Sequence, residues 1–186
     1  MTDLPDHDIG MGHAFMRPSG PLTDGRFDIP MVPILVNCLY APQPTAARCA
    51  SVARAVRKII EEDWPADLRV AVVGSGGLWH TPGAPESYLD ADFDHEILER
   101  LEAGDADAMA SYFDHWTPKP ELSNLRCFEQ FTGGSGMAGG VGGGSGETRN
   151  WIMAAALADR PGRVIDYIPV YASPCGIGFA HWEMNG

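Results

Sequence analysis

The chain has 186 residues, of which 45% are hydrophobic and 20% charged, a composition typical of globular domains rather than disordered segments. This length allows one domain with a sizeable core. The formal net charge of −12 would repel phosphate backbones, so we expect no nucleic-acid partner. The apolar runs are too short for a membrane span, and the acidic N-terminus is unlike a secretory or mitochondrial presequence. We therefore expect a cytoplasmic protein.

The cysteine pattern indicates no metal or disulfide framework. The four cysteines contain neither a CxxC pair nor zinc-type spacing; they are Cys38, Cys49, Cys127 and Cys175. In a reducing compartment we expect reduced and mostly buried thiols.

The first half of the chain predicts a parallel α/β unit. Residues 1–30 are rich in Gly, Pro, Asp and His without periodicity and are expected to be irregular. The apolar run at 31–39 is typical of a buried strand. Apolar residues at spacings of three and four predict a helix over 44–63, and a second buried strand is expected at 68–73. Strand, helix and strand in this order favour parallel pairing.

The second half predicts further helices around a long loop. A helix is expected at 94–103 and another from about residue 105. Residues 116–146 are rich in Pro and Gly and are expected to form an inserted loop. A helix at 147–158 and a strand at 164–171 follow, and 176–180 is either a short strand or an ordered loop. The fold class predicted for residues 1–186 is one α/β domain with a mixed or mainly parallel central sheet flanked by helices.

His80 is the first candidate for chemistry, because it follows the predicted strand 68–73 through a run of glycines, Gly74-Ser75-Gly76-Gly77. Glycines let the backbone turn sharply and leave room for a ligand. Sites of parallel α/β sheets form at the carboxyl ends of strands, and an imidazole there can give and take a proton. A hydrogen-bonded loop histidine with no catalytic role is the alternative.

Glu147 follows the second glycine-rich stretch at 133–146 and begins the predicted helix. A phosphate cradle is disfavoured, because no P-loop Lys-[Ser/Thr] is present and an acidic residue stands at the anion position. The other readings are a flexible linker that ends in a first-turn glutamate favoured by the helix dipole, and a metal-ligating carboxylate.

The remaining histidines carry weaker signals. His7 and His13 lie in the irregular N-terminal segment, and the surroundings of His13 do not match a metal motif by spacing. His95 is expected to be solvated on its helix, and the sequence does not place His115 or His181.

Together these segments resemble the class III (LigB-type) extradiol ring-cleavage dioxygenases. Residues 70–80, VAVVGSGGLWH, are similar to the family's strand and GSGGLSH signature. Residues 146–152, GETRNWI, are similar to its GxEIRNW signature. The segment Gly12-His13-Ala14-Phe15 resembles the surroundings of the family's second active-site histidine. The resemblance covers roughly residues 6–180.

The resemblance implies a specific chemistry for these positions. Members open a catechol-type ring beside its hydroxyls with both atoms of O₂ at non-haem Fe(II). It implies that His80 is the acid–base residue, that His13 contacts substrate and dioxygen, and that Glu147 binds the iron. For an acid-bearing substrate, such as a catecholic or phenolic acid, Arg17, Arg149 and Asn150 are candidate anchors by residue type.

Two departures from the family pattern bear on function. Trp79 replaces the Ser usual before the catalytic histidine and is expected to crowd or reshape the pocket. The family's two iron-ligand histidines lie upstream of the His13 segment, so the resemblance implies that the family's N-terminal part is lacking and that Glu147 is the one metal ligand present. The alternatives are a dioxygenase component completed by another chain or by an absent N-terminal region, and a non-catalytic or truncated subunit that completes or regulates a partner's site. A third is an unrelated activity, such as a small α/β hydrolase or a nucleotide binder, which the lack of a G-x-S-x-G elbow between strand and helix disfavours. Exposed sheet edges would favour a homo-oligomer or a partner subunit.

Overall fold

The structure, a computed structural model, describes residues 12–39, 42–81, 86–122 and 143–183. The chain divides into two compact units, Met1–Leu35 and Val36–Gly186. No helix in these ranges is long and apolar enough to cross a membrane.

The first unit contains helix α1, His13–Leu22, within the segment 1–30 that the sequence predicted to be irregular. Pro18 and Pro21 lie inside this helix and obscure its periodicity. The helix ends at its C-cap Thr23. The Thr23 hydroxyl donates to the Ser19 carbonyl at 2.8 Å and accepts from the Phe27 amide at 2.9 Å.

In the described part of the second unit there are four α-helices, and side-chain caps define the starts of three of them. In α2 (Ala46–Asp63), Thr45 accepts a hydrogen bond from the Arg48 amide; α3 (Ala91–Ala103) and α4 (Ala106–His115) begin at the capping residues Asp90 and Asp105, as expected for N-caps. Gly104 ends α3 at φ 75°, a conformation that favours glycine. The last helix is α5 (Thr148–Ala158), and short 3-10 helices cover η1 (Pro120–Leu122) and η3 (Gly143–Glu147).

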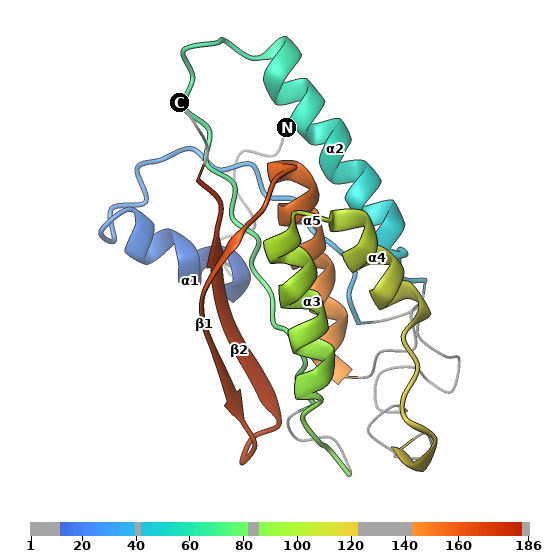
Figure 1. Ribbon diagram of the computed structural model, residues 1–186. Helices are drawn as coiled ribbons and strands as arrows, with labels where there is room; N and C mark the ends of the chain where they lie inside the picture. The colour runs from blue at the N-terminus through green and yellow to red at the C-terminus, as the bar shows by residue number, and fades with distance from the viewer. Residues whose placement is uncertain (1–11, 40–41, 82–85, 123–142, 184–186) are drawn as a thin grey trace. The chain divides into compact units, whose positions relative to one another are not determined.

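A β-hairpin follows the helices. Strands β1 (Arg163–Val170) and β2 (Cys175–His181) pair antiparallel, with Ile168 opposite Ile177 and an irregularity between Val164 and Asp166. In Figure 1, helices α3, α4 and α5 lie along one side of this hairpin. The helices predicted at 44–63, 94–103 and 147–158 and the strand predicted at 164–171 are confirmed within a few residues.

The predicted central parallel sheet is not confirmed. Within the described residues the sheet has two strands, both from the hairpin. The segments predicted as buried strands, 31–39 and 68–73, form neither helix nor strand and have mostly exposed side chains. Their apolar, β-branched composition favours extended backbone, but a strand also needs a neighbour for its backbone hydrogen bonds. The fold class that stands is mixed α/β.

The core of the second unit lies between the helices and the hairpin. Its fully buried large side chains include Leu78, Trp79, Phe93, Phe113 and Ile152, so the end of the glycine-rich segment is itself part of the core. Helix α2 packs on α4 and α5, and α3 packs on α4 and on β1. The residue before His80 is therefore fixed by packing.

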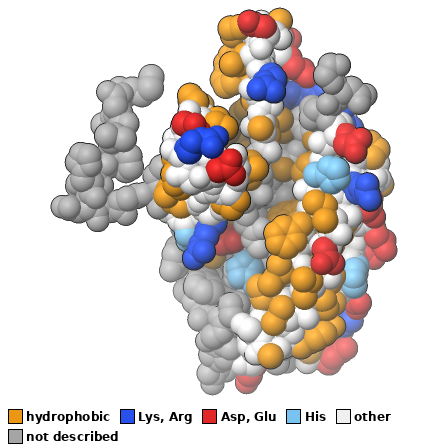
Figure 2. All heavy atoms as spheres, turned by 90° about the vertical axis from the view of Figure 1, so that its left-hand side faces the viewer, with side chains coloured by type: hydrophobic (Ala, Val, Ile, Leu, Met, Phe, Trp, Pro, Cys, Tyr) orange, Lys and Arg blue, Asp and Glu red, His pale blue; other side chains and the backbone are white. Residues whose placement is uncertain are grey.

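Large apolar side chains also remain exposed on the hairpin. Ile165 is 64% exposed, Phe179 57%, Ile168 46% and Ile177 40%. Hydrophobic side chains gather on the face of the molecule drawn in Figure 2. Contiguous exposed apolar surface of this kind is typical of interaction sites.

Candidate active site

The glycine-rich segment before His80 lies directly against helix α5. A Cβ on Gly74 would lie 2.9 Å from the Asn150 carbonyl, and one on Gly76 would lie 2.9 Å from the Glu147 carbonyl. The Trp151 indole N–H donates to the Gly76 carbonyl at 2.9 Å. Only glycine allows so close an approach, which brings the first turn of α5 beside His80.

His80 and Glu147 meet where these two segments touch. Oε2 of Glu147 accepts a hydrogen bond from the Gly77 amide at 2.9 Å and lies 3.8 Å from Nε2 of His80. The His80 side chain is 19% exposed and that of Glu147 34%, so both are partly shielded and still reachable by a small molecule. The distance of 3.8 Å is too long for a hydrogen bond.

The other ring nitrogen determines what His80 can do. Nδ1 lies 2.9 Å from the Leu78 carbonyl, and a carbonyl can only accept, so Nδ1 carries the proton. In the neutral ring Nε2 then has a lone pair, and it is the nitrogen that faces Glu147. Such a ring is prepared to take a proton at Nε2.

Two glycines make room for this ring. A Cβ on Gly77 would lie 2.5 Å from His80 Nδ1, and a Cβ on Gly144 would overlap Nε2. Gly144 belongs to η3, at the end of the glycine-rich stretch that the sequence marked. Glycine at these positions is thus explained by close approach to His80.

The backbone around His80 is held from several sides. The His80 amide donates to Ser145 Oγ at 3.0 Å, and its carbonyl accepts from the Gly144 amide at 2.9 Å. The Trp79 carbonyl accepts from the Gly176 amide at 2.7 Å, and the Thr81 amide donates to the Pro174 carbonyl at 2.9 Å. These contacts with η3 and the hairpin fix the backbone that carries the His80 ring, as a preorganised site requires.

Trp79 does not crowd the site, which corrects the expectation from the sequence. Its side chain is fully buried, and its indole N–H donates to the Tyr88 carbonyl at 2.7 Å. Its ring packs against Phe93 and Trp116 at centroid distances of 5.3 and 5.1 Å. Neighbouring residues of an extended segment point to opposite sides, so Trp79 enters the core while His80 faces Glu147.

Asp94 was missed by the sequence analysis. Its carboxylate is fully buried; Oδ1 accepts from the Trp79 amide at 2.7 Å and Oδ2 from the Tyr167 hydroxyl at 2.8 Å. Burial raises the pKa of Asp94 to about 7, although these hydrogen bonds oppose the shift. The signal was present, because Asp94 precedes Ile97 and Leu98 by three and four positions and so falls on the apolar stripe of α3.

Arg149 is part of the structure rather than a substrate anchor. It is 1% exposed; Nε donates to the Pro44 carbonyl at 2.8 Å and Nη1 to the Gly146 carbonyl at 3.0 Å. Its guanidinium lies 4.7 Å from the centre of the Phe113 ring. Burial lowers the pKa of Arg149. Asn150 is half-buried, with its side-chain amide beside Gly76.

His13 and Arg17 belong to the first unit, whereas His95 belongs to the second. His13 begins α1 in the first unit and is exposed, as is Arg17. His95 is exposed, as expected, with its ring 5.0 Å from that of Tyr167. His7, Cys127 and most of the loop 116–146 lie outside the described residues. The remaining cysteines are free thiols, buried at 38 and 49 and half-buried at 175.

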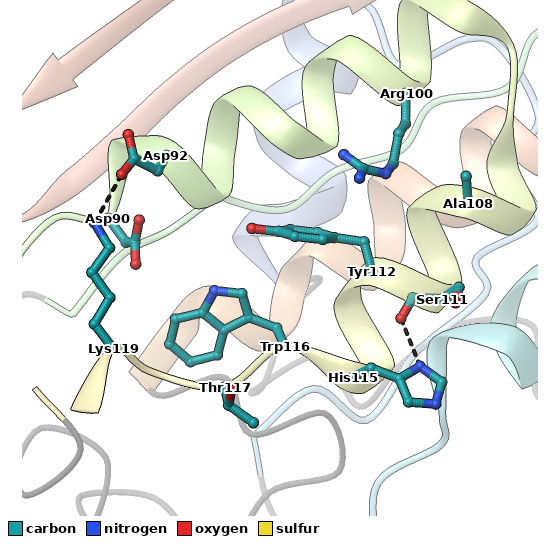
Figure 3. A pocket seen from close by; sticks show the side chains of 10 residues that line it. All are labelled: Asp90, Asp92, Arg100, Ala108, Ser111, Tyr112, His115, Trp116, Thr117 and Lys119. Carbon is teal, nitrogen blue, oxygen red and sulfur yellow. Dashed lines mark hydrogen bonds and ion pairs between the residues drawn. The ribbon is translucent and has the colours of Figure 1, made fainter.

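A cavity of about 600 Å³ lies elsewhere, between α3, α4 and the segment after α4 (Figure 3). Its two cationic side chains are already paired, Lys119 with Asp92 at 2.9 Å and Arg100 with Glu96. Burial raises the pKa of Tyr112, another lining residue, to about 12. Neither His80 nor Glu147 lines this cavity.

The side chains near Glu147 do not complete a metal site. Over the described ranges, no three His, Cys, Asp or Glu side chains converge so as to hold a metal ion. A facial Fe(II) site takes two histidines and a carboxylate and leaves positions open for substrate and O₂. These residues alone therefore do not fit a resident iron ion.

The comparison with protein families decides the relationship. Residues 5–171 match the family described as the catalytic LigB subunit of aromatic ring-opening dioxygenase. The chain belongs to the LigB family. The match includes His13, His80 and Glu147, and it confirms the resemblance found in the sequence signatures.

Curated relatives of this LigB-family chain carry dioxygenase names. It is 34% identical over 97 residues to a gallate dioxygenase of Pseudomonas putida; the aligned region covers 50% of this chain and 28% of that protein. It is 36% identical over 92 residues to a 2,3-dihydroxyphenylpropionate/2,3-dihydroxicinnamic acid 1,2-dioxygenase of Photorhabdus laumondii, covering 50% of this chain and 27% of that one. The matched region thus spans less than a third of these relatives. No solved structure matches significantly.

Proposed function

We propose that this chain is a component of an extradiol dioxygenase that opens a catechol-type phenolic acid with O₂ at Fe(II), with His80 as its acid–base residue. The observation that carries the proposal is the pairing of His80 and Glu147. The Nδ1–H of His80 is held by the Leu78 carbonyl, and Nε2 faces the Glu147 carboxylate at 3.8 Å. An unprotonated Nε2 can accept a proton from a substrate hydroxyl and later return it.

Glu147 is proposed as one ligand of the iron, and His13 as a second residue at the substrate. A carboxylate that keeps one oxygen on a backbone amide is oriented for ligation by its remaining lone pairs. Because the described residues supply no set of three ligands, the other ligands are proposed to come from another chain or from residues outside the described ranges. We propose that residues 1–186 form one partial LigB-like domain and that 116–146 is an insertion.

The substrate class follows from the relatives. Gallate and 2,3-dihydroxyphenylpropionate, which those proteins' names give as substrates, share two neighbouring ring hydroxyls and a carboxylate. We propose a substrate with these groups. Arg149 is excluded as the anchor for its carboxylate by its buried contacts with the Pro44 and Gly146 carbonyls; Asn150 and Arg17 remain candidates.

The test is oxygen uptake by the chain, purified together with any protein that accompanies it, with Fe(II) and gallate, protocatechuate or 2,3-dihydroxyphenylpropionate, and absorbance of the ring-opened product. His80→Gln is expected to lower turnover by at least 100-fold, and Glu147→Gln to lower the apparent iron affinity. His115→Gln and Glu99→Gln are matched controls, because both residues are exposed. Equal turnover by wild type and His80→Gln would refute the acid–base role.

A second function is favoured by the incomplete ligand set: a non-catalytic subunit that completes or regulates a partner's site. The exposed apolar side chains of the hairpin are proposed to be covered by that partner or by a second copy. Light scattering distinguishes these states. A stable monomer that neither binds iron nor takes up oxygen would favour the non-catalytic alternative. A stable monomer with full turnover would contradict both this alternative and the proposal that a partner completes the site.

A further inference from the structure

We propose that Asp94 is a positioning residue for His80, acting through the Trp79 amide and held in place by the Tyr167 hydroxyl. The proposal rests on the proposed function for the role of His80. The contacts that carry it are independent of that role, because they are features of the fold.

The first step is the bond between Asp94 and the residue before His80. Oδ1 accepts the Trp79 N–H at 2.7 Å in a fully buried setting, where hydrogen bonds to charged groups are strong. The Trp79 carbonyl is held at 2.7 Å by the Gly176 amide. Since peptide groups are planar, holding both polar groups of Trp79 orients the Cα of His80.

The second step is the bond that orients Asp94 itself. Oδ2 accepts from the Tyr167 hydroxyl of β1 at 2.8 Å. A Cβ on Gly176 would overlap Oδ2, so glycine there leaves space for the carboxylate. Asp94 thus joins α3, β1 and β2 to the segment that carries His80.

The third step is the energetic cost of this arrangement. A carboxyl group with no exposed surface loses hydration, and burial raises the pKa of Asp94 to about 7. An apolar residue on this stripe of α3 would avoid that cost but would leave the buried Trp79 N–H without its acceptor. Ionisable groups whose pKa values are shifted by burial occur often in functional sites.

The experiment compares Asp94→Ala, Asp94→Asn and Tyr167→Phe in the full chain. Asp92→Asn is the matched control, since Asp92 lies on the same helix, is exposed and pairs with Lys119. The readouts are hydrogen exchange of the Trp79, His80 and Thr81 amides and the His80 tautomer from ¹⁵N NMR. Neither requires metal, substrate or activity.

In Asp94→Ala, hydrogen exchange of the Trp79, His80 and Thr81 amides is expected to become faster by a factor at least ten times larger than for the Ala50 amide in α2. The His80 ring is expected to populate both tautomers. Asp94→Asn keeps an acceptor for the Trp79 N–H, so it is expected to restore both readouts. Uniformly faster exchange with an unchanged tautomer would overturn the proposal. If Asp94→Ala does not fold, Tyr167→Phe provides the test. Faster exchange of the amides around His80 in Tyr167→Phe would support the proposal, and unchanged exchange of these amides would overturn it.

Turnover separates this proposal from the proposed function. Where the wild-type chain opens a ring, Asp94→Ala is expected to lower kcat with little change in KM. Where the wild type opens no ring, the proposed function fails while the exchange and tautomer results still test whether Asp94 positions His80.

Discussion

Nε2 of His80 lies 3.8 Å from Oε2 of Glu147, and the same carboxylate oxygen accepts a hydrogen bond from the Gly77 amide. One carboxylate thus contacts both the histidine and the glycine-rich segment that leads to it. This arrangement depends on glycines that bring the segment and helix α5 into backbone contact.

The tautomer of His80 is directly measurable. The Leu78 carbonyl at 2.9 Å requires Nδ1–H, so in the neutral ring the Nε2 signal is expected at the frequency of an unprotonated nitrogen in ¹⁵N correlation spectra. His115, whose Nδ1 lies 2.9 Å from the Ser111 carbonyl but which is exposed, serves as reference and is expected to show more averaging. A protonated Nε2 in neutral His80 would be incompatible with its role as base.

Gly144→Ala is expected to displace the His80 ring, because the added Cβ would overlap Nε2. Such overpacking typically costs about 1–3 kcal/mol, measurable as a lower urea midpoint, and the His80 resonances are expected to shift. Gly20→Ala is the control, since its Cβ would meet its nearest neighbour at 3.8 Å and alanine is favoured inside a helix. An unchanged His80 spectrum in Gly144→Ala would contradict the described packing.

The stability of the chain is expected to depend on pH through Asp94. Its pKa is about 7 in the folded state and about 3.9 when unfolded, so the folded state binds the proton more tightly. The resulting stabilisation is complete below pH about 4 and is lost as pH rises to about 7, by roughly 4 kcal/mol at most. Asp94→Asn removes this dependence.

The measurement is urea denaturation of both proteins at several pH values. The stability of Asp94→Asn relative to wild type should rise between pH 4 and 8, whereas Asp92→Asn should show no such rise. Parallel curves for Asp94→Asn and wild type would show that Asp94 does not titrate in this range.

Arg149 is expected to stabilise the fold. Replacing it with Lys removes donors from the buried carbonyls of Pro44 and Gly146, and lysine cannot reproduce the planar fork of arginine. We expect a loss of about 2–3 kcal/mol in the free energy of unfolding, against less than about 0.5 kcal/mol for the exposed control Arg48→Lys. A stable Arg149→Lys protein with a raised KM would instead indicate substrate contact.

Local patterns predicted helices α2 to α5 but not α1, which lies in the segment expected to be irregular. Spacings of three and four in 94–103 set the buried face of α3, and alanine-rich 147–158 became α5. In α2 the buried residues are Ala46, Cys49, Ala50 and Ala53, whereas Ile59 of the apolar stripe in 44–63 is 48% exposed. The hairpin strand β1 was also predicted. Each of these elements is specified by its own residues, through periodicity and caps.

Features that depend on distant partners were not predictable from residues alone. The apolar runs at 31–39 and 68–73 suit strands, but whether they pair depends on neighbours elsewhere. The side of the backbone to which Trp79 points follows from packing with Phe93 and Trp116. The sequence indicated a special role for Asp94 only through its position as a charged residue on the apolar stripe of α3. The pairing of His80 with Glu147 was suggested by family signatures, not by spacing.

The proposal that Glu147 supplies one metal ligand beside His80 is tested most directly with Mn²⁺, an air-stable substitute for Fe(II). Added Mn²⁺ is expected to broaden the His80 imidazole signals before those of His115, and Glu147→Gln should abolish this selectivity while Glu99→Gln preserves it. Equal broadening of His80 and His115, or selectivity that survives in Glu147→Gln, would contradict the proposal.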